Sequence, residues 1–114
     1  MLPKEYRLKK KTAFLATYRT GKTIHRDGLT VFVGKGKVDE SPTKVGFVVS
    51  KKIHKRAVKR NRIKRLMRES YRLLIKEGAV SDKYLSLVFV ASSKLLGLGF
   101  NEIDSAMRKL VYKL

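Results

Sequence analysis

One stretch of the chain, residues 57–74 with the sequence AVKRNRIKRLMRESYRLL, limits the fold more than any other. Its apolar side chains recur at the i, i+3, i+4 spacing that is typical of a helix with one buried face. These side chains are Ile63, Leu66, Met67, Leu73 and Leu74, with Ser70 inside the same stripe. The pattern predicts one long helix, from about Arg56 to Ile75, that packs on a core.

The same helix carries a ladder of like charges at Arg60, Lys64, Arg68 and Arg72. Cations four residues apart repel one another by roughly 0.2–0.5 kcal/mol per pair, and cations near a helix N-terminus oppose its dipole. Residues 51–72 hold eleven Lys and Arg against one acid, whereas solvated helix faces usually mix charges. Because such violations of local rules are expected mainly at functional sites, the segment predicts contact with an anionic partner.

The charge of the whole chain indicates the class of that partner. There are 28 Lys and Arg against 9 Asp and Glu, a formal net charge of +19, which favours nucleic acid first and an anionic membrane surface second. No apolar run approaches the roughly 18 residues of a membrane span, and no secretory apolar core follows the N-terminus. With no cysteine in the chain, we expect a cytoplasmic protein that does not bind membranes.

The other elements complete the prediction of one α+β domain over residues 1–114. Residues 1–11 are predicted to form a basic, extended lead-in that can be flexible, followed by a short helix that Thr12 caps and Gly21 ends. Strands are predicted at 29–34 and 44–50, paired as antiparallel neighbours, with a short strand at 22–26 before them.

The C-terminal part of the chain is predicted to add one strand and one helix. The near-continuous apolar run at 84–92 indicates a strand that is buried on both faces. Asn101 is predicted to cap the last helix, with Asp104 at its third position. The apolar face of that helix is Ile103, Met107, Leu110, Val111 and Leu114.

No self-sufficient active site is recognisable in the sequence. The carboxylates form no acid/base or metal motif, and His25 and His54 lack the spacing of metal ligands. The glycines of residues 34–36 lack the Lys-Ser/Thr and the helix that a phosphate-binding loop requires.

Three aromatic residues, Phe14, Tyr18 and Phe32, offer a second candidate surface. They could stack on unpaired bases, and plain core packing is the alternative that the residues alone leave open. Phe32 alternates with Leu29, Val31 and Val33 along its strand, and so is expected to face the opposite side of the sheet. RNA and DNA also stay open, because no helix-turn-helix, heptad or zinc-ligand pattern surrounds the basic helix.

The segment KVGFVVSKKIHKRAVKRNRIKRLMRESYR resembles the signature of the bacterial ribonuclease P protein component. In that family an apolar strand ends in Lys-Lys and is followed by Arg-Ala and by Arg-Asn-Arg-x-Lys-Arg, here Arg60 to Arg65. The basic and then aromatic stretch RLKKKTAFLATYRTGK and the strand YLSLVFVAS are similar to the family as well. The resemblance spans nearly the whole chain.

The resemblance implies an α-β-β-β-α-β-α two-layer domain with a four-stranded sheet and a left-handed βαβ crossover, a ribosomal protein S5 domain 2-like fold. It implies the protein subunit of a ribonucleoprotein endonuclease that removes the 5′ leader of precursor tRNA. The catalytic RNA, with Mg²⁺, would carry the chemistry, so no catalytic residue is expected in the protein and any protein-bound metal position is unknown. The free protein would be a monomer, with the catalytic RNA and precursor tRNA as its partners.

The resemblance also assigns candidate site residues. Those expected to bind the catalytic RNA are Lys51, Lys52, Arg56, Lys59, Arg60, Asn61, Arg62, Lys64, Arg65 and Arg68. Those expected to line a cleft for the precursor-tRNA leader are Lys10, Phe14, Tyr18 and Phe32. Some family members carry Tyr at position 32, so Phe32 offers stacking without a hydroxyl. Another RNA-binding assembly factor or ribosome-associated protein is the alternative, and a self-contained metal-dependent nuclease is a third function class.

Overall fold

The computed structural model of the chain describes residues 2–37, 39–81 and 83–114. Met1 of the predicted lead-in, Val38 of the loop before the second predicted strand and the carboxylate of Asp82 therefore lie outside the described residues. The elements follow one another in an order that confirms the predicted succession of helices and strands. They are η1 (Lys4–Tyr6), α1 (Lys11–Arg19), β1 (Lys22–Arg26), β2 (Leu29–Val33), β3 (Lys44–Val48), α2 (Ala57–Lys76), β4 (Ser86–Ala91), η2 (Ser93–Leu95) and α3 (Phe100–Val111).

The four strands form one mixed sheet in the order β1-β2-β4-β3. Strand β2 pairs antiparallel with both β1 and β4, and β3 pairs parallel with β4. The predicted short strand at 22–26 is confirmed, but the predicted pairing of 29–34 with 44–50 is wrong, because β4 lies between them. The strongly apolar β4 needs an interior place in the sheet, and the connection at 34–43 is long enough to let β3 pair on its far side.

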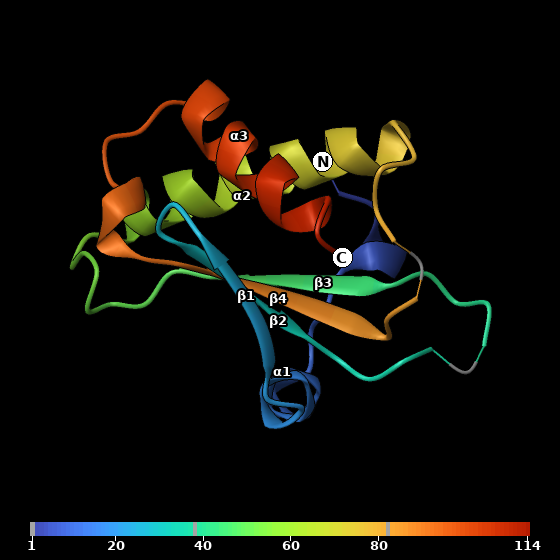
Figure 1. The fold of residues 1–114 in the computed structure, drawn as a ribbon. Helices are drawn as coiled ribbons and strands as arrows, with labels where there is room; N and C mark the ends of the chain where they lie inside the picture. The colour runs from blue at the N-terminus through green and yellow to red at the C-terminus, as the bar shows by residue number, and fades with distance from the viewer. Residues whose placement is uncertain (1, 38, 82) are drawn as a thin grey trace.

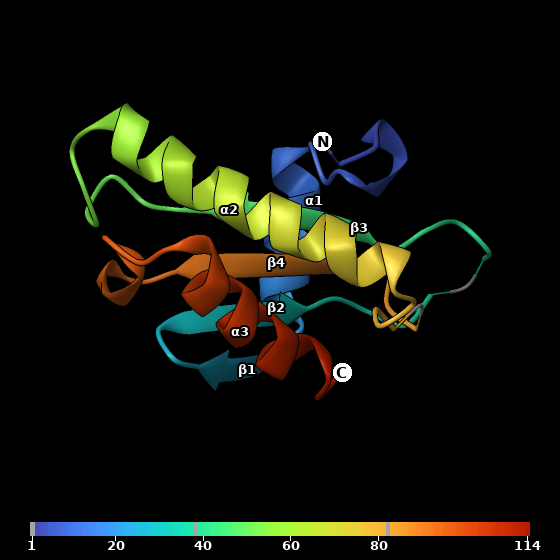
Figure 2. The same cartoon turned by 90° about the horizontal axis from the view of Figure 1, so that it is seen from above.

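The connection from β3 through α2 to β4 is left-handed, as the resemblance implied. In Figure 2 helices α2 and α3 lie in front of the sheet, and β3 and β4 run in the same direction. When the view is turned so that these strands point upward, β4 lies to the left of β3, with α2 in front of both. Nearly all such crossovers are right-handed, so this unusual hand separates the fold from ordinary βαβ units.

Helices cover both faces of the sheet. Figure 1 shows α2 and α3 above the sheet and α1 beneath it. The core lies mainly between the sheet and the α2–α3 pair, where the rings of Phe47, Tyr71 and Phe89 meet at centroid distances of 5.7–6.0 Å. Because α1 covers the opposite face, β4 is buried on both sides, which confirms the prediction from its continuous apolar run.

Helix α2 confirms the long amphipathic helix almost to the residue. Ile63, Met67, Ser70 and Leu74 of the predicted stripe are buried, and Leu66 and Leu73 are half-buried at its margin. Tyr71, which the stripe did not include, is also fully buried. Within the described residues, no helix is both long and apolar enough to cross a membrane.

The two predicted helix caps are wrong. Helix α1 begins at Lys11 after an extended Lys10, so Thr12 is its second residue, whereas Gly21 follows the helix with a positive φ of 72° as expected. Helix α3 begins at Phe100, and the backbone N–H of Gly99 donates to Glu102 Oε1 at 3.1 Å. An acceptor side chain near a helix start did not fix the first residue in either case.

The lead-in is anchored along the open edge of β3. Leu2 is only 1% exposed, and Arg7 Nε donates to its carbonyl oxygen at 2.8 Å. Arg7 forms a parallel bridge with Val45, and the N–H of Leu8 donates to the Val45 carbonyl at 2.9 Å. Residues 4–6 form the short 3-10 helix η1, so the extended form that was predicted for the lead-in is wrong there.

Candidate nucleic-acid interface

The charged residues of α2 lie on two flanks of the helix, and each flank contacts a different part of the protein. Its buried stripe faces the sheet, and Arg62 on one flank contacts the α3 region, as do Ser70 of the stripe and Glu77 just after the helix. The opposite flank, with Lys64 and Arg68, borders the lead-in and the edge of β3. The basic helix therefore presents its cations on more than one surface.

Two arginines of the Arg-Asn-Arg motif are held by main-chain carbonyl groups. Arg60 Nη1 donates to the carbonyls of His54 and Lys55 at 2.8 and 2.7 Å, which ties the loop before α2 to the helix. Arg62 Nη2 donates to the Leu98 carbonyl at 2.9 Å. These bonds fix the direction of each guanidinium while its other N–H groups keep their capacity to donate.

Most of the other predicted RNA-binding residues are exposed around the N-terminal half of α2. The exposed ones are Lys51, Lys52, Arg56, Lys59, Asn61 and Arg65. Val58 lies among them and is 76% exposed, a large apolar surface that the charge pattern did not indicate. The first turn of α2 holds no acid, and Arg56 at its N-cap supplies no side-chain cap, so the positive end of the helix dipole adds to this field.

Arg72, at the end of the charge ladder, differs from these residues. Its Nη2 lies 2.6 Å from Glu69 Oε1, and its Nε donates to Glu69 Oε2 at 3.2 Å. The hydrogen bond raises the pKa of Arg72 and lowers the pKa of the Glu69 carboxyl. The one acid in the basic segment therefore neutralises the far end of the ladder.

The aromatic residues lie on the sheet face that α1 covers. In the strand register Phe32 of β2, Val88 of β4 and Gly46 of β3 form one row, which confirms that Phe32 faces away from the main core. Tyr18 meets Phe32 edge to face, with ring centroids 4.8 Å apart. Both rings are half-buried, and this burial raises the pKa of Tyr18.

Phe14 lies directly against the backbone of Gly46. A Cβ atom added to Gly46 would stand 2.4 Å from Phe14 Cε1, which is closer than any real contact of that kind. The glycine therefore lets the ring approach the strand closely. Phe14 is half-buried, so part of its ring faces solvent.

Phe14 and two cations of α2 line one groove of about 340 Å³ at the edge of β3, here called the β3-edge groove. Lys64 and Arg68 come from α2, and Arg7 and Lys9 come from the lead-in. Residues that were assigned separately to catalytic RNA and to the leader cleft therefore meet at one surface. Tyr18 and Phe32 are not part of its lining, and Lys10 lines a neighbouring groove that shares Arg7 and Lys9.

Arg7 and Lys9 were not among the predicted site residues. The basic composition of residues 4–11 was a signal for them, but the sequence did not show that the lead-in docks beside β3. Four cations on one apolar and aromatic groove suit a single strand of nucleic acid, since phosphates can meet the cations while a base stacks on the ring.

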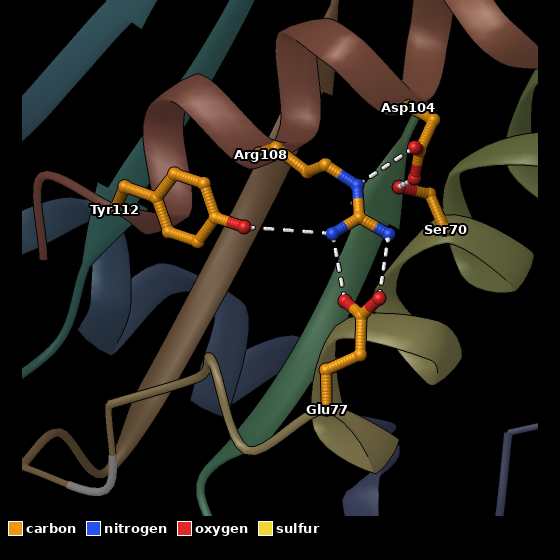
Figure 3. A network of polar contacts seen from close by, with 5 residues as sticks. All are labelled: Ser70, Glu77, Asp104, Arg108 and Tyr112. Atoms are coloured by element: carbon orange, nitrogen blue, oxygen red, sulfur yellow. Dashed lines mark hydrogen bonds and ion pairs between the residues drawn. The ribbon is translucent and has the colours of Figure 1, made fainter.

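Two of the carboxylates, Glu77 and Asp104, help to hold the fold together. Figure 3 shows Arg108 between Glu77 and Asp104, with its Nη1 2.7 Å from Glu77 Oε2 and its Nε 2.8 Å from Asp104 Oδ2. Asp104 also accepts a hydrogen bond from the buried Ser70 at 2.6 Å. The hydrogen bonds to Glu77 and Asp104 raise the pKa of Arg108. Together with the Ser70 bond, they join α2 to α3.

No group of three or more His, Cys, Asp or Glu side chains comes together anywhere in the part of the chain that the structure describes. The charged side chains around the start of α2 and in the β3-edge groove are lysines and arginines, and these repel metal cations. The residues therefore fit phosphate recognition and do not fit a protein-held metal ion.

Comparison with known proteins yields consistent matches. The family model described as Ribonuclease P matches residues 2–114. The chain is 37% identical over 108 residues to the ribonuclease P protein component of Clostridium kluyveri, covering 95% of this chain and 93% of that protein. It is 38% identical over 104 residues to the same component of Clostridioides difficile, covering 91% of this chain and 87% of that protein.

Solved structures agree with these relatives. The Staphylococcus aureus RNase P protein superposes with a TM-score of 0.78 at 25% identity, covering 94% of this chain and 93% of that one. The RNase P protein from Thermotoga maritima superposes with a TM-score of 0.79 over 95% of this chain and 96% of that one, at 24% identity, and so supports the fold alone.

Proposed function

The chain belongs to the ribonuclease P protein family, and from that membership we propose how its surfaces act in removing the 5′ leader from precursor tRNA. It is the protein subunit of ribonuclease P, the endoribonuclease of tRNA 5′ processing, and it works with the ribonuclease P RNA. This membership decides against an unrelated assembly factor or ribosome-associated protein and against a self-contained nuclease.

The catalytic RNA binds the exposed cations around the start of α2. Lys51, Lys52 and Arg56 precede the helix, and Lys59, Asn61 and Arg65 project from it. Arginine forks suit phosphate oxygens, and Arg60 and Arg62 are already oriented by their carbonyl partners. RNA phosphates would supply the negative charge that the helix lacks, so binding should weaken as salt rises.

The single-stranded leader of precursor tRNA lies along the α1 face of the sheet. Its bases stack on Phe14, and on the exposed parts of Tyr18 and Phe32, while Lys64 and Arg68 at the β3-edge groove and Lys10 in the adjoining groove meet its phosphates. The observation that carries this proposal is that Phe14, Lys64 and Arg68 line one groove although they come from different elements. Contact by stacking alone would tolerate many leader sequences.

The Mg²⁺ that the reaction needs would be held by the RNA of the holoenzyme. The described part of the protein offers no cluster of metal ligands, and three of its carboxylates, Glu69, Glu77 and Asp104, are already bound by Arg72, Arg108 and Ser70. The protein supplies cations that draw the two RNAs together, and the free protein is a cytoplasmic monomer.

Substitution of Phe14 by Ala tests the leader contact. We expect reconstituted holoenzyme with this variant to bind precursor tRNA about tenfold more weakly, because one stacked base is lost, and to bind mature tRNA unchanged. Tyr112→Ala, which removes an exposed ring on the far side of the sheet, is the matched control. Equal loss for precursor and mature tRNA, with an unchanged melting temperature, would refute the leader contact.

A further inference from the structure

A second, more apolar cavity lies on the other flank of α1 from Phe14 and Tyr18. It has a volume of about 500 Å³, within the range of about 300–1,000 Å³ that is usual for ligand pockets. Its walls include Ala13 and Ala16 of α1, Pro42 of the β2–β3 connection, and Leu85 before β4. We call it the α1 cavity, and the leader contacts proposed above do not use it.

The small side chains of α1 leave this space open. Ala13 and Ala16 face the cavity where longer residues would fill it. The buried hydroxyls of the lining are already paired, because those of Thr17 and Ser86 lie 2.6 Å apart and Thr17 also donates to the Ala13 carbonyl at 2.9 Å. An occupant would therefore be held by apolar and stacking contact rather than by hydrogen bonds specific to one base.

The charge around the cavity is positive. Lys35 and Lys44 are part of its lining, and both are exposed. Asp39 accepts bonds from the N–H and the hydroxyl of Ser41 at 3.0 and 2.5 Å, but it is not part of the wall. An apolar cavity rimmed by lysines suits a planar base whose phosphate carries negative charge.

The groove that Lys10 lines lies between this cavity and the β3-edge groove, beside the start of α1. We call it the cationic channel. The channel is lined by five cations and one acid, namely Lys4, Arg7, Lys9, Lys10, Lys44 and Glu5. It shares Leu8, Ala13 and Lys44 with the cavity, and it shares Arg7, Leu8 and Lys9 with the β3-edge groove. The three depressions therefore adjoin one another, and the cations among their shared residues suit a phosphate backbone.

We propose that the α1 cavity binds a nucleobase of the precursor-tRNA leader upstream of the bases on Phe14, with the intervening phosphates on the cationic channel. This proposal rests on the proposed leader contact at Phe14, because the cationic channel adjoins the β3-edge groove that Phe14 lines. It extends the recognised leader to a second site with little preference for base identity. It also predicts that affinity depends on whether a leader is long enough to reach the cavity.

Leader length is the first variable of the test. Holoenzyme reconstituted with wild-type protein is titrated with precursor tRNAs whose leaders are lengthened one nucleotide at a time. We expect affinity to rise by about tenfold at one length beyond that needed for Phe14, which is the effect of one further stacked base. A fluorescent base analogue at that leader position should change its emission on binding. Affinity that stays flat beyond the Phe14-dependent step would overturn the proposal.

Two variants locate the effect. Ala13→Leu should narrow the cavity, and Lys44→Ala should remove the cation common to cavity and channel. The increase in affinity beyond the length needed for Phe14 is here called the late gain. We expect each variant to abolish the late gain and to leave the affinity for precursor tRNAs with short leaders unchanged. Thr12→Leu, exposed on the same helix, and Lys113→Ala, exposed beyond α3, are the matched controls. A late gain that survives in both cavity variants, with melting temperatures like wild type, would also overturn the proposal.

Phe14→Ala in the same titrations separates this proposal from the function on which it rests. If Phe14 binds the leader, this variant loses affinity already for short leaders. A short-leader loss together with no late gain would refute the α1 cavity alone. No short-leader loss would refute the leader contact at Phe14 and, with it, the proposed site in the α1 cavity.

Discussion

At the scale of single residues, neighbours decide what a cation on α2 can do. Arg65 and Arg72 lie two helical turns apart, and the sequence presents both as members of one basic segment. Arg65 is exposed, whereas Arg72 is bound to both carboxylate oxygens of Glu69. Charge composition finds the segment, but the structure is needed to separate free cations from paired ones.

Replacing Arg65 by Ala should weaken binding of the catalytic RNA several-fold and lower the slope of log affinity against log salt by about 1, because one phosphate contact is lost. Filter binding over a range of salt concentrations measures both quantities. Arg72→Ala is the control on the same helix and should leave the slope nearly unchanged. Equal slopes for wild type and Arg65→Ala would contradict a phosphate contact at this position.

Gly46 provides a second test at the residue scale. A methyl group at this position would meet the ring of Phe14, so Gly46→Ala should displace the ring and weaken precursor binding by about 1–2 kcal/mol. At Gly36 an added Cβ would find its nearest neighbour, the Lys83 carbonyl oxygen, 4.0 Å away, so Gly36→Ala is the matched control. If both variants bind precursor tRNA with wild-type affinity, the position of the Phe14 ring against Gly46 does not matter for leader binding.

At the scale of elements, the sequence predicted periodic features well and long-range pairing poorly. The stripe of α2 and the alternation around Phe32 are local patterns, and both are confirmed. The position of β4 between β2 and β3 depends on contacts between distant segments, and adjacency in sequence favoured the wrong pair. The family resemblance, rather than periodicity, supplied the left-handed crossover.

The candidate site shows the same division. The basic segment and the three aromatic residues were found from the sequence, although whether they contact RNA stays a prediction. The meeting of Phe14 with Lys64 and Arg68 was not found, because it depends on how α1, β3 and α2 pack. The α1 cavity was not found either, since small residues such as Ala13 carry little signal in a single sequence.

The contact of α2 with α3 can be tested through Ser70. This side chain is fully buried and donates to Asp104, which is itself bound to Arg108. Ser70→Ala should lower the free energy of unfolding by about 1–2 kcal/mol, because the hydrogen bond reaches a charged acceptor. Urea denaturation measures the change, and Ser105→Ala on the exposed face of α3 is the control. Equal stability of the two variants would show that the bond contributes little.

At the scale of the whole molecule, a compact fold coexists with a large excess of positive charge. The radius of gyration is 13.2 Å, about the value expected for a chain of this length, although the net charge is +19. Self-repulsion at this charge opposes the compact state. Bound RNA would relieve it, so the free protein bears a cost in stability that the complex does not.

The melting temperature of the free protein should therefore rise with salt. Screening shortens the reach of surface charges to about 10 Å at 0.1 M ionic strength and further above it, so repulsion between the cations of α2 weakens. Thermal unfolding at increasing sodium chloride concentration measures the effect, with a variant carrying Lys59→Glu and Lys113→Glu as a control that should respond less. A melting temperature that falls with salt would contradict net repulsion as a cost of this fold.

The most direct test of the central claim, that this protein assists cleavage by the ribonuclease P RNA, is a reconstitution. Precursor tRNA is incubated at low Mg²⁺ with the protein alone, with the ribonuclease P RNA alone, and with both together. We predict cleavage at the mature 5′ end only when both are present, because the protein's cations compensate for scarce metal while the RNA carries the chemistry. Cleavage by the protein alone, or no gain when it is added to the RNA, would contradict the account.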